Sequence, residues 1–278
     1  MILLTACSKS GTSAGRDPDV LKVTVLPDEN ASKITQDNEG LRKYLEGKLG
    51  KKVEIYAFTN YTAMIEAFRN KNVDLCYFGP LSYCIAVDKG AEAECFACKV
   101  KNGLKSYRSV IITSVDSGIH TLADIRGRKM GYGDIASTSS HLIPKCELAK
   151  AGVNEGDYAE SFLGKHDVVA VSVQNGAVDA GGMSKPIFEG MIADGKLDKA
   201  KMKVLHESAE IPDYPWAMQK DLAPALKEKI RAAFHELKDK NVLKPLKADG
   251  FATISDADYD VIREAAKILK KDLAKLEN

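Results

Sequence analysis

The chain has 278 residues, of which 45% are hydrophobic and 28% are charged. This composition is typical of a folded globular protein, and the length favours two lobes over a single core. Because 40 Lys and Arg residues nearly balance 39 Asp and Glu residues, the charge excludes a whole-molecule field that would attract nucleic acid or an anionic membrane, so any anion site must be local.

The N-terminal segment predicts a lipid anchor. Residues 4–7 read Leu-Thr-Ala-Cys, the form of a bacterial lipoprotein processing box in which Cys7 is the lipidated residue. Residues 8–18 are small and polar, as a tether would be. A chance match to so short a box is the alternative. Since no later stretch approaches the length of a membrane span, we expect residues 1–20 to be a signal remnant and tether, and the protein to be a periplasmic or cell-surface lipoprotein anchored to a bacterial membrane.

Strands and helices alternate along the first third of the chain. Three apolar runs predict strands, at residues 21–26, 53–58 and 73–78. A helix follows each of them, beginning near Ser32, Asn60 and Leu81. Asn60 is a strong capping residue, and Gly50 ends the first helix because glycine adopts the left-handed conformation that helix C-termini favour. This order favours a mostly parallel sheet with helices on both faces.

The middle of the chain repeats this rhythm. Two long strands are predicted at residues 95–100 and 106–114, joined by the turn at Asn102 and Gly103, before a short helix at 121–127. Further strands are predicted at residues 128–132, 178–182 and 203–206, and further helices at 166–173 and 186–192. Residues 211–216 read as a loop, and the remainder as mainly helical. Because the alternation restarts, we expect two α/β lobes.

A turn rich in hydroxyl side chains follows the predicted strand at residues 128–132. Ser137, Thr138 and Ser139 stand where the next helix begins, so their O–H groups lie beside the free backbone N–H groups of its first turn, at the positive end of the helix dipole. Such a helix N-terminus is a cradle for an anion. The structural alternative is that Ser137 or Thr138 only caps the helix.

Five cysteines remain after Cys7, and an odd number cannot all pair. Cys95 and Cys98 have the spacing of a redox or metal motif, but no second pair or nearby histidine completes a zinc site. We therefore interpret most of the five as small core residues. The sequence predicts no metal site and no other cofactor.

Five segments appear in the order and approximate spacing of one known family. They are Tyr77-Phe-Gly-Pro-Leu-Ser-Tyr83, Ser106-Tyr107-Arg-Ser109, Asp134-Ile-Ala-Ser-Thr-Ser-Ser140, Gly164-Lys-His166-Asp and Asn175-Gly-Ala-Val-Asp179. In these segments, and along nearly all of the chain from Leu21 to the final helices, the sequence resembles the phosphite and phosphonate substrate-binding proteins of bacterial ABC transporters. The resemblance implies a binding protein rather than an enzyme, with a small oxyanion as ligand and a permease and ATPase complex as partner.

The resemblance also implies the two-lobed periplasmic binding protein fold of type II. This is an α/β fold with a ligand cleft between the lobes and a two-strand hinge. We place the crossovers near Thr113 and Pro212. The first lobe then comprises residues 21–112 and 212–278, and the second lobe comprises residues 113–211.

The resemblance gives ligand-binding roles to residues that have ordinary structural interpretations when taken alone. The implied donors to the ligand are Ser137, Thr138, Ser139, Tyr61, Tyr107 and His166. Taken alone, Tyr107 is an aromatic on a strand face, Tyr61 lies on a helix surface, and His166 is a local cap. Only their joint occurrence in the five segments favours the ligand-binding interpretation.

The sequence departs from the family where an amine would be bound. Members that bind an aminoalkyl phosphonate are expected to present carboxylates to its ammonium group, and one such position falls on Pro186 or its neighbours, with Glu189 a helix turn away. A proline-rich loop places Tyr214 and Trp216 where the other acid would stand. A small pocket with an apolar wall follows, which favours phosphite, with methylphosphonate next. Asp213 still offers an acceptor for an amine, so phosphate and 2-aminoethylphosphonate remain alternatives.

Two other classes of function use the same residues. Ser137 with His166 and either Asp167 or Asp179 could form a hydrolase triad, but no Gly-x-Ser-x-Gly elbow surrounds Ser137. A lipoprotein that senses a ligand would use the same cleft, and the sequence does not separate it from a transport protein.

Overall fold

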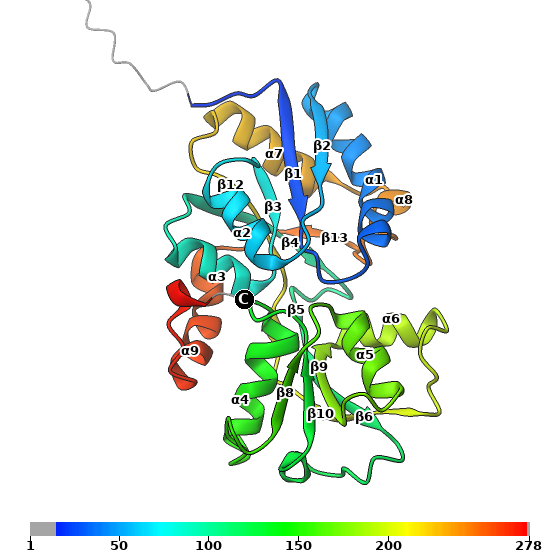
Figure 1. Ribbon diagram of the computed structural model, residues 1–278. Coiled ribbons are helices and arrows are strands. Elements are labelled where there is room, and N and C mark those ends of the chain that lie inside the picture. The colour runs from blue at the N-terminus through cyan, green and yellow to red at the C-terminus, as the bar shows by residue number, and fades with distance from the viewer. Residues whose placement is uncertain (1–14, 277–278) are drawn as a thin grey trace, which may run out of the picture.

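In the described residues, the strands form three sheets, of six, five and two strands (Figure 1). The structure, a computed structural model, describes residues 15–276. The predicted lipidation site, Cys7, lies outside these residues. Within them, no helix is both long enough and apolar enough to span a bilayer.

The six-stranded sheet is the centre of the first lobe. Its order is β13-β4-β12-β3-β1-β2, with β1 at Val20–Val25, β2 at Lys52–Tyr56, β3 at Leu75–Tyr77, β4 at Ala93–Val100, β12 at Pro215–Gln219 and β13 at Gly250–Ala252. β1 pairs in parallel with β2 and β3, because a helix carries the chain back after each strand. β12 is antiparallel to β3 and β4, and β13 is antiparallel to β4. The sheet is therefore mixed rather than mostly parallel.

β12 and β13 correct the expectation of a loop followed by mainly helical structure after residue 211. Every residue of β12 is buried, because the strand has a neighbour on each side and helices cover both faces of the sheet. Such a strand shows no alternation of apolar and polar residues, which is the main sequence signal of a strand. β13 has only three residues and carries no periodic pattern.

Helices cover both faces of this sheet. One face is covered by α1 (Ala31–Leu49), α7 (Pro224–Glu236) and α8 (Lys240–Leu243), and the other by α2 (Tyr61–Arg69), α3 (Pro80–Asp88) and α9 (Asp260–Ile268). The caps predicted for the first two helices are confirmed. The Asn60 side chain accepts a hydrogen bond from the N–H of Ala63, and Gly50 ends α1 with a φ of 64°.

The second lobe is built on the five-stranded sheet. Its order is β10-β6-β9-β7-β8, with β6 at Ser109–Ser114, β7 at Lys129–Tyr132, β8 at Ala159–Phe162, β9 at Ala180–Ser184 and β10 at Met202–Glu207. Its α-helices are α4 (Ile143–Lys150), α5 (His166–Gln174) and α6 (Lys185–Ala193). The sequence did not predict β8, because none of its residues is fully buried at this edge of the sheet and no apolar run marks it.

Two short strands join the lobes. β5 (Ser106–Tyr107) pairs antiparallel with β11 (Ile211–Pro212), so the two crossing segments lie side by side. The long strand predicted at residues 106–114 is thus two strands, broken at Arg108. The crossover expected near Thr113 falls inside β6, which belongs to the second sheet, whereas the one expected near Pro212 falls on β11.

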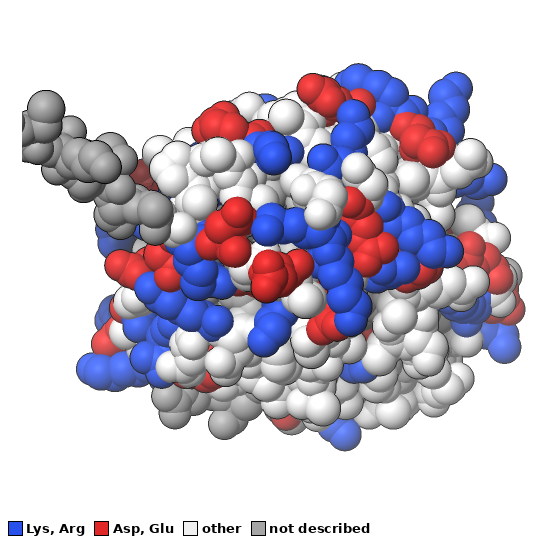
Figure 2. All heavy atoms as spheres, turned by 90° about the horizontal axis from the view of Figure 1, so that it is seen from above, with Lys and Arg blue, Asp and Glu red and all other residues white. Residues whose placement is uncertain are grey.

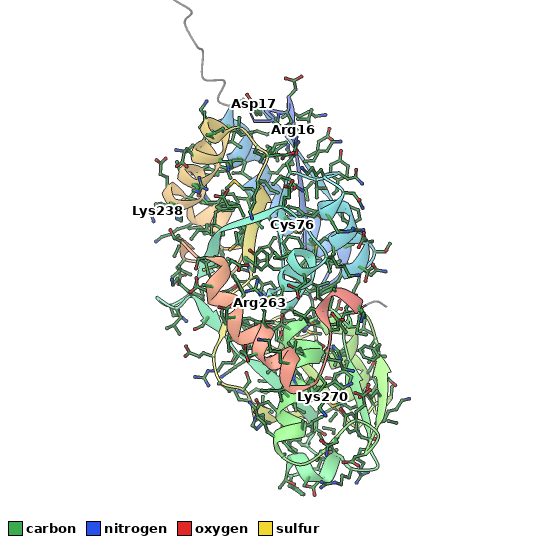
Figure 3. The ribbon with its side chains drawn as sticks, turned by 90° about the vertical axis from the view of Figure 1, so that its left-hand side faces the viewer. Arg16, Asp17, Cys76, Lys238, Arg263 and Lys270 are labelled. Carbon is green, nitrogen blue, oxygen red and sulfur yellow. The ribbon has the colours of Figure 1, made fainter. Side chains whose placement is uncertain are left out.

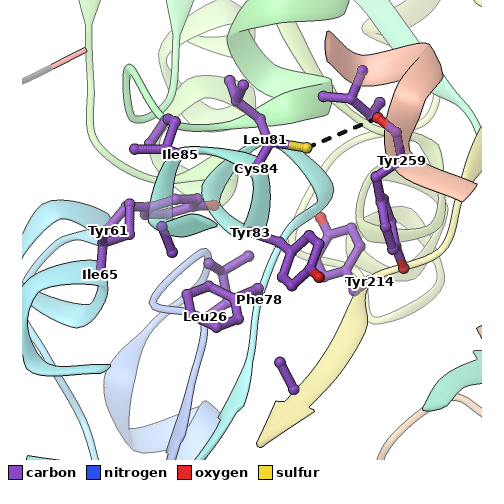
Figure 4. Close-up of a cluster of buried hydrophobic side chains, with 14 of the residues drawn as sticks. Leu26, Tyr61, Ile65, Phe78, Leu81, Tyr83, Cys84, Ile85, Tyr214 and Tyr259 are labelled. Atoms are coloured by element: carbon purple, nitrogen blue, oxygen red, sulfur yellow. Dashed lines mark hydrogen bonds between the residues drawn. The ribbon is translucent and has the colours of Figure 1, made fainter. Parts of the chain in front are cut away.

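The lobes also contact each other away from this hinge. Leu142 and Cys146 of the second lobe belong to the same apolar core as α3 and α9 of the first. The Cys146 thiol donates to the carbonyl oxygen of Ala265 at 3.4 Å. Figure 4 shows part of this core, in which the Cys84 thiol points to the backbone of Tyr259. In the side view of Figure 3, α9, which carries the labelled Arg263, lies where the lobes meet.

Four short helices of 3-10 or π type complete the fold. They are η1 (Leu122–Ile125), η2 (Thr138–Leu142), η3 (Asp256–Tyr259) and η4 (Leu273–Lys275). At the end of the first lobe, basic and acidic side chains are intermixed rather than gathered by sign (Figure 2). This distribution agrees with the expectation that an anion site must be local.

Candidate functional site

The hydroxyl-rich turn lies at the start of a continuous helix formed by η2 and α4. Ser137 is the cap, since its Oγ accepts a 3.2 Å hydrogen bond from the N–H of Ser140. Ser139 is fully buried, yet its Oγ has no hydrogen-bond partner among the described residues. Both interpretations of the turn therefore apply, to different residues. Ser137 caps the helix, and Ser139 is left with a hydroxyl that a ligand can use.

Thr138 faces the other lobe. Its Oγ1 accepts a 2.8 Å hydrogen bond from the N–H of Leu81, in the first turn of α3. A hydroxyl that accepts one hydrogen bond still has its own hydrogen to donate. Thr138 is therefore held in place from the first lobe while it remains a donor for an anion.

His166 is the first residue of α5 and is buried. Its Nδ1 lies 3.1 Å from the backbone N–H of Ser184, which can only donate. Nδ1 is therefore the acceptor, and the ring hydrogen is on Nε2, 3.5 Å from the Oγ of Ser137. Burial lowers the pKa of His166 to about 3, so the ring is neutral at neutral pH and offers one N–H donor to the cleft.

Tyr61 and Tyr107 bring hydroxyls from the first lobe and from the hinge. Tyr61 begins α2, and its backbone N–H donates to the Asp134 carboxylate of the second lobe at 3.2 Å. Tyr107 lies in β5, and its buried hydroxyl has no hydrogen-bond partner among the described residues. Burial raises the pKa of both phenols, so both stay protonated. Three buried hydroxyls have no partner among the described residues, on Ser139, Tyr107 and Tyr77, and such groups indicate a site that is completed by a ligand.

A cavity of about 680 Å³ is lined by both lobes, and of the six predicted donors Tyr107 is the one that lines it. Four aromatic side chains form one wall. The Tyr77 ring lies between Tyr214, at 5.5 Å between ring centroids, and Trp216, at 5.1 Å, and the edge of Tyr107 meets Tyr214 at 5.1 Å. Tyr214 and Trp216 were predicted for this wall. Tyr77 was not assigned a role, although it ends β3 at the edge of the sheet where ligands of α/β proteins bind.

Acidic residues also line the cavity, among them Asp213 and Asp28. Asp213, a predicted site residue, accepts a 2.6 Å hydrogen bond from the N–H of Tyr214, and burial raises its pKa. Asp28 was missed. Burial and then Glu29 raise its pKa to about 7. The sequence marks Asp28 by its position shortly after β1. Like Tyr77, it therefore lies at the carboxyl ends of the parallel strands, where ligands of α/β proteins bind.

The structure does not support the hydrolase triad. The Nδ1 atom of His166 accepts from a backbone N–H, so no carboxylate orients the ring as a triad requires. The Asp179 carboxylate accepts a hydrogen bond from the N–H of Lys129, at the start of β7. Asp167 accepts from the backbone N–H of Val168. Ser137 and His166 are therefore neighbours without the third member.

The sequence also suggested residues that could bind an amine and a cysteine pair with the spacing of a metal motif. Pro186 and Glu189 line the outer part of the cavity, where Glu189 is largely exposed and lies 4.0 Å from the ammonium of Lys185. Within residues 15–276, no group of His, Cys, Asp or Glu side chains is arranged to hold a metal ion. All five cysteines of this region are free, and four of them are buried.

Comparison with known proteins identifies the family. Residues 23–259 match the family described as "ABC transporter, phosphonate, periplasmic substrate-binding protein". The chain belongs to this family. It is 29% identical to the phosphate-import protein PhnD of Mycolicibacterium smegmatis, over 99% of this chain and 94% of that protein. It is 27% identical to the probable ABC transporter phosphite-binding protein PhnD1 of Prochlorococcus marinus, over 92% and 91% of the two chains.

The fold of the family is confirmed by a solved structure. PhnD1 from Prochlorococcus marinus in complex with methylphosphonate superposes with a TM-score of 0.85 at 26% identity, covering 92% of this chain and all of that one. The chain is thus the non-enzymatic, periplasmic substrate-binding component of an ABC importer, with a small ligand and a permease and ATPase as partners. The relatives are named for phosphate, phosphite and methylphosphonate, so the ligand is a question for the site itself.

Proposed function

We propose that this phosphonate-binding protein captures phosphite in preference, with methylphosphonate next, and delivers it to its permease. The observation that carries the proposal is the two-sided site. Hydrogen-bond donors gather at the starts of η2 and α5, and the rings of Tyr77, Tyr214 and Trp216 wall the cavity that Tyr107 also lines. Phosphite has three oxygens and one P–H hydrogen that neither donates nor accepts usefully, so it matches a site of this form.

The donors suit the oxygens of such a ligand. Ser139 and Tyr107 have unused hydroxyls, Thr138 has a free hydroxyl hydrogen, and His166 offers Nε2–H. Together with the Tyr61 phenol of the first lobe, these donors come from both lobes and from the hinge, so a bound oxyanion favours the closed arrangement. Hydrogen bonds to a charged acceptor are among the stronger ones in proteins, at about 1.5–3 kcal/mol each.

The aromatic wall sets the order of preference. Phosphate would press a fourth oxygen, with its hydroxyl or negative charge, against the rings of Tyr214 and Trp216, which would leave a polar group without a partner at about 1–3 kcal/mol. The methyl group of methylphosphonate is apolar and only needs space. We therefore rank phosphite first, methylphosphonate second, and phosphate weaker.

2-Aminoethylphosphonate is a second candidate, favoured by one specific observation. Asp28 and Asp213 both line the cavity next to the donors, and a carboxylate is the natural partner of an ammonium group. Against it stands the Lys99 ammonium, which lies 4.9 Å from the centre of the Tyr77 ring on the same wall. We rank this ligand below methylphosphonate for that reason.

Calorimetric titration of the purified soluble domain tests this ranking. The panel contains phosphite, methylphosphonate, phosphate, 2-aminoethylphosphonate and sulfate, each at the same pH and ionic strength. We expect the dissociation constant to rise in the order phosphite, methylphosphonate and then the others. Tightest binding of 2-aminoethylphosphonate would show that the carboxyl groups, not the rings, decide specificity.

The membrane attachment is a separate proposal. We infer that the thiol of Cys7 carries the lipid anchor, on the basis of the processing box at residues 4–7. Growth with a clickable fatty acid should label the native protein and a Cys95→Ser control, and leave a Cys7→Ser variant unlabelled. Labelling of the Cys7→Ser variant would contradict the inference.

A further inference from the structure

Asp28 lies in the site, but an acidic residue is not explained by the binding of an anion there. It lies in the loop between β1 and α1, and its carbonyl oxygen accepts a 3.0 Å hydrogen bond from the N–H of His166 across the lobes. Its carboxyl group lines the cavity. Among the described residues, no other residue forms a hydrogen bond or ion pair with that carboxyl group.

The surroundings of the Asp28 carboxyl are mostly uncharged. The 3.0 Å hydrogen bond between the N–H of His166 and the carbonyl oxygen of Asp28 places the residue beside one of the donors. The charged or titratable groups that face it are Glu29 of the same loop, Lys33 of α1, Lys99 of β4, Asp213 before β12, and the phenols of Tyr61, Tyr77 and Tyr214. Lys33 already pairs with Asp37 and Glu29. Lys99 is therefore the nearest base that no acid neutralises within residues 15–276.

An ionised carboxylate in this position conflicts with a bound oxyanion. Two negative groups that share a desolvated site repel each other unless one of them holds a proton. The second dissociation of a phosphorus oxyanion, between its monoanion and its dianion, occurs near neutral pH. The raised pKa of Asp28, about 7, lies in the same range. A proton between the two groups converts the repulsion into a short charge-assisted hydrogen bond.

We propose that Asp28 shares one proton with the bound phosphorus oxyanion, and that it is therefore a specificity-determining residue for oxyanions that exchange a proton near neutral pH. This inference rests on the proposed function, since it requires a phosphorus oxyanion in the site. The shared proton is bonded either to a ligand oxygen or to the carboxyl group. In both cases the ligand and Asp28 together hold one proton. The Lys99 ammonium offsets part of the negative charge of the pair.

The test is the affinity for phosphite and for methylphosphonate as a function of pH. Above the pKa of both groups, neither the free ligand nor free Asp28 holds the proton, so binding must take one up. Linkage then requires the affinity to fall about tenfold per pH unit between about pH 8 and 9. His166 does not titrate in this range, because its pKa is far lower. Titration in two buffers with different ionisation enthalpies counts the proton directly.

Three variants make the assignment specific. Asp28→Asn keeps the size and the backbone contacts, so we expect binding without proton uptake and an affinity that no longer falls between pH 8 and 9. Glu29→Gln removes a neighbouring charge from the same loop and should keep the native slope, with one proton taken up. Asp213→Asn tests the competing assignment, because it removes the other carboxyl group that we place in the site.

Several outcomes overturn the inference. It fails if the native protein binds phosphite without taking up a proton, if Asp28→Asn still takes one up, or if only Asp213→Asn removes the slope. The melting temperature of each variant separates lost binding from lost folding. If no phosphorus oxyanion binds the native protein at any pH, the proposed function fails instead, so the two failures are distinguishable.

Discussion

The Oγ1 atom of Thr138 in the second lobe accepts a 2.8 Å hydrogen bond from the backbone N–H of Leu81 in the first lobe. One buried hydroxyl thereby joins the lobes and keeps its hydrogen for a ligand. The first turn of α3 and the first turn of the helix that begins at Thr138 meet at this bond. In the function proposed above, closure of the cleft and capture of the anion would depend on the same atom.

Replacing Thr138 with Val tests this dual role. Valine keeps the shape but removes both the acceptor for Leu81 and the donor for the ligand, so two polar groups lose a partner in a closed site. We expect the binding free energy for phosphite to weaken by about 1.5–3 kcal/mol, measured by calorimetry. Thr138→Ser keeps the hydroxyl and should bind nearly as well as the native protein. Equal affinity of the Val variant, with a lower melting temperature, would leave Thr138 only a structural role.

Ligand binding should close the lobes. Three hydrogen bonds between the lobes lie beside the proposed ligand donors: Leu81–Thr138, Asp28–His166 and Tyr61–Asp134. A ligand that uses donors from both lobes stabilises the arrangement in which the lobes meet. Small-angle scattering should give a smaller radius of gyration with saturating phosphite than without it. Identical profiles would mean that the lobes stay closed in the absence of ligand.

His166 should make stability depend on pH. Its pKa falls from 6.5 to about 3 on folding because of burial. The unfolded chain therefore binds more protons than the folded chain between those values, and the free energy of unfolding decreases as the pH drops through this window. Denaturant titrations should show a smaller loss between pH 6.5 and 4 for His166→Gln than for the native protein. The exposed His120 serves as a control, since His120→Gln should follow the native curve.

Tyr214 should control the size of ligand that fits. Truncation to Ala removes a ring from the wall, so phosphonates with longer substituents should gain affinity relative to phosphite. The variant should also melt at a lower temperature, since removing a buried aromatic side chain costs about 3–5 kcal/mol of stability. Tyr214→Phe retains the ring and should retain the native order of ligands. A Tyr214→Ala protein with an unchanged order would place the wall elsewhere, with Tyr77 the next residue to test.

The parts of the molecule that sequence reading predicted well have local causes. A cap such as Asn60 or a terminator such as Gly50 acts through its own backbone. The hydroxyl-rich turn and His166 stand at helix starts, which sequence patterns mark. The two-lobed fold and the family were predicted from segments that keep their order, and the comparisons confirm both.

The parts that sequence reading missed depend on contacts between distant segments. β12 is a strand because β3 and β4 flank it, and nothing within Pro215–Gln219 shows this. Tyr77 joins the aromatic wall only through its contacts with Tyr214 and Trp216. Asp28 is an ordinary loop acid in the sequence, and its interest comes from burial and from the absence of a basic partner in the described part of the chain. The finer assignment of ligand roles to Ser139, Tyr107 and the other donors stays a prediction until binding is measured.

The central place of β12 also determines the order in which the molecule can assemble as it is made. β3 and β4 are both present long before residue 215 is synthesised, yet they cannot pair, because the position between them belongs to β12. The second lobe has no such gap, since all five of its strands lie between residues 109 and 207. During synthesis and export from the N-terminus, the second lobe is therefore the first that can reach its final form. The sheet of the first lobe stays incomplete until β12 pairs with β3 and β4. The cleft cannot bind a ligand before that step.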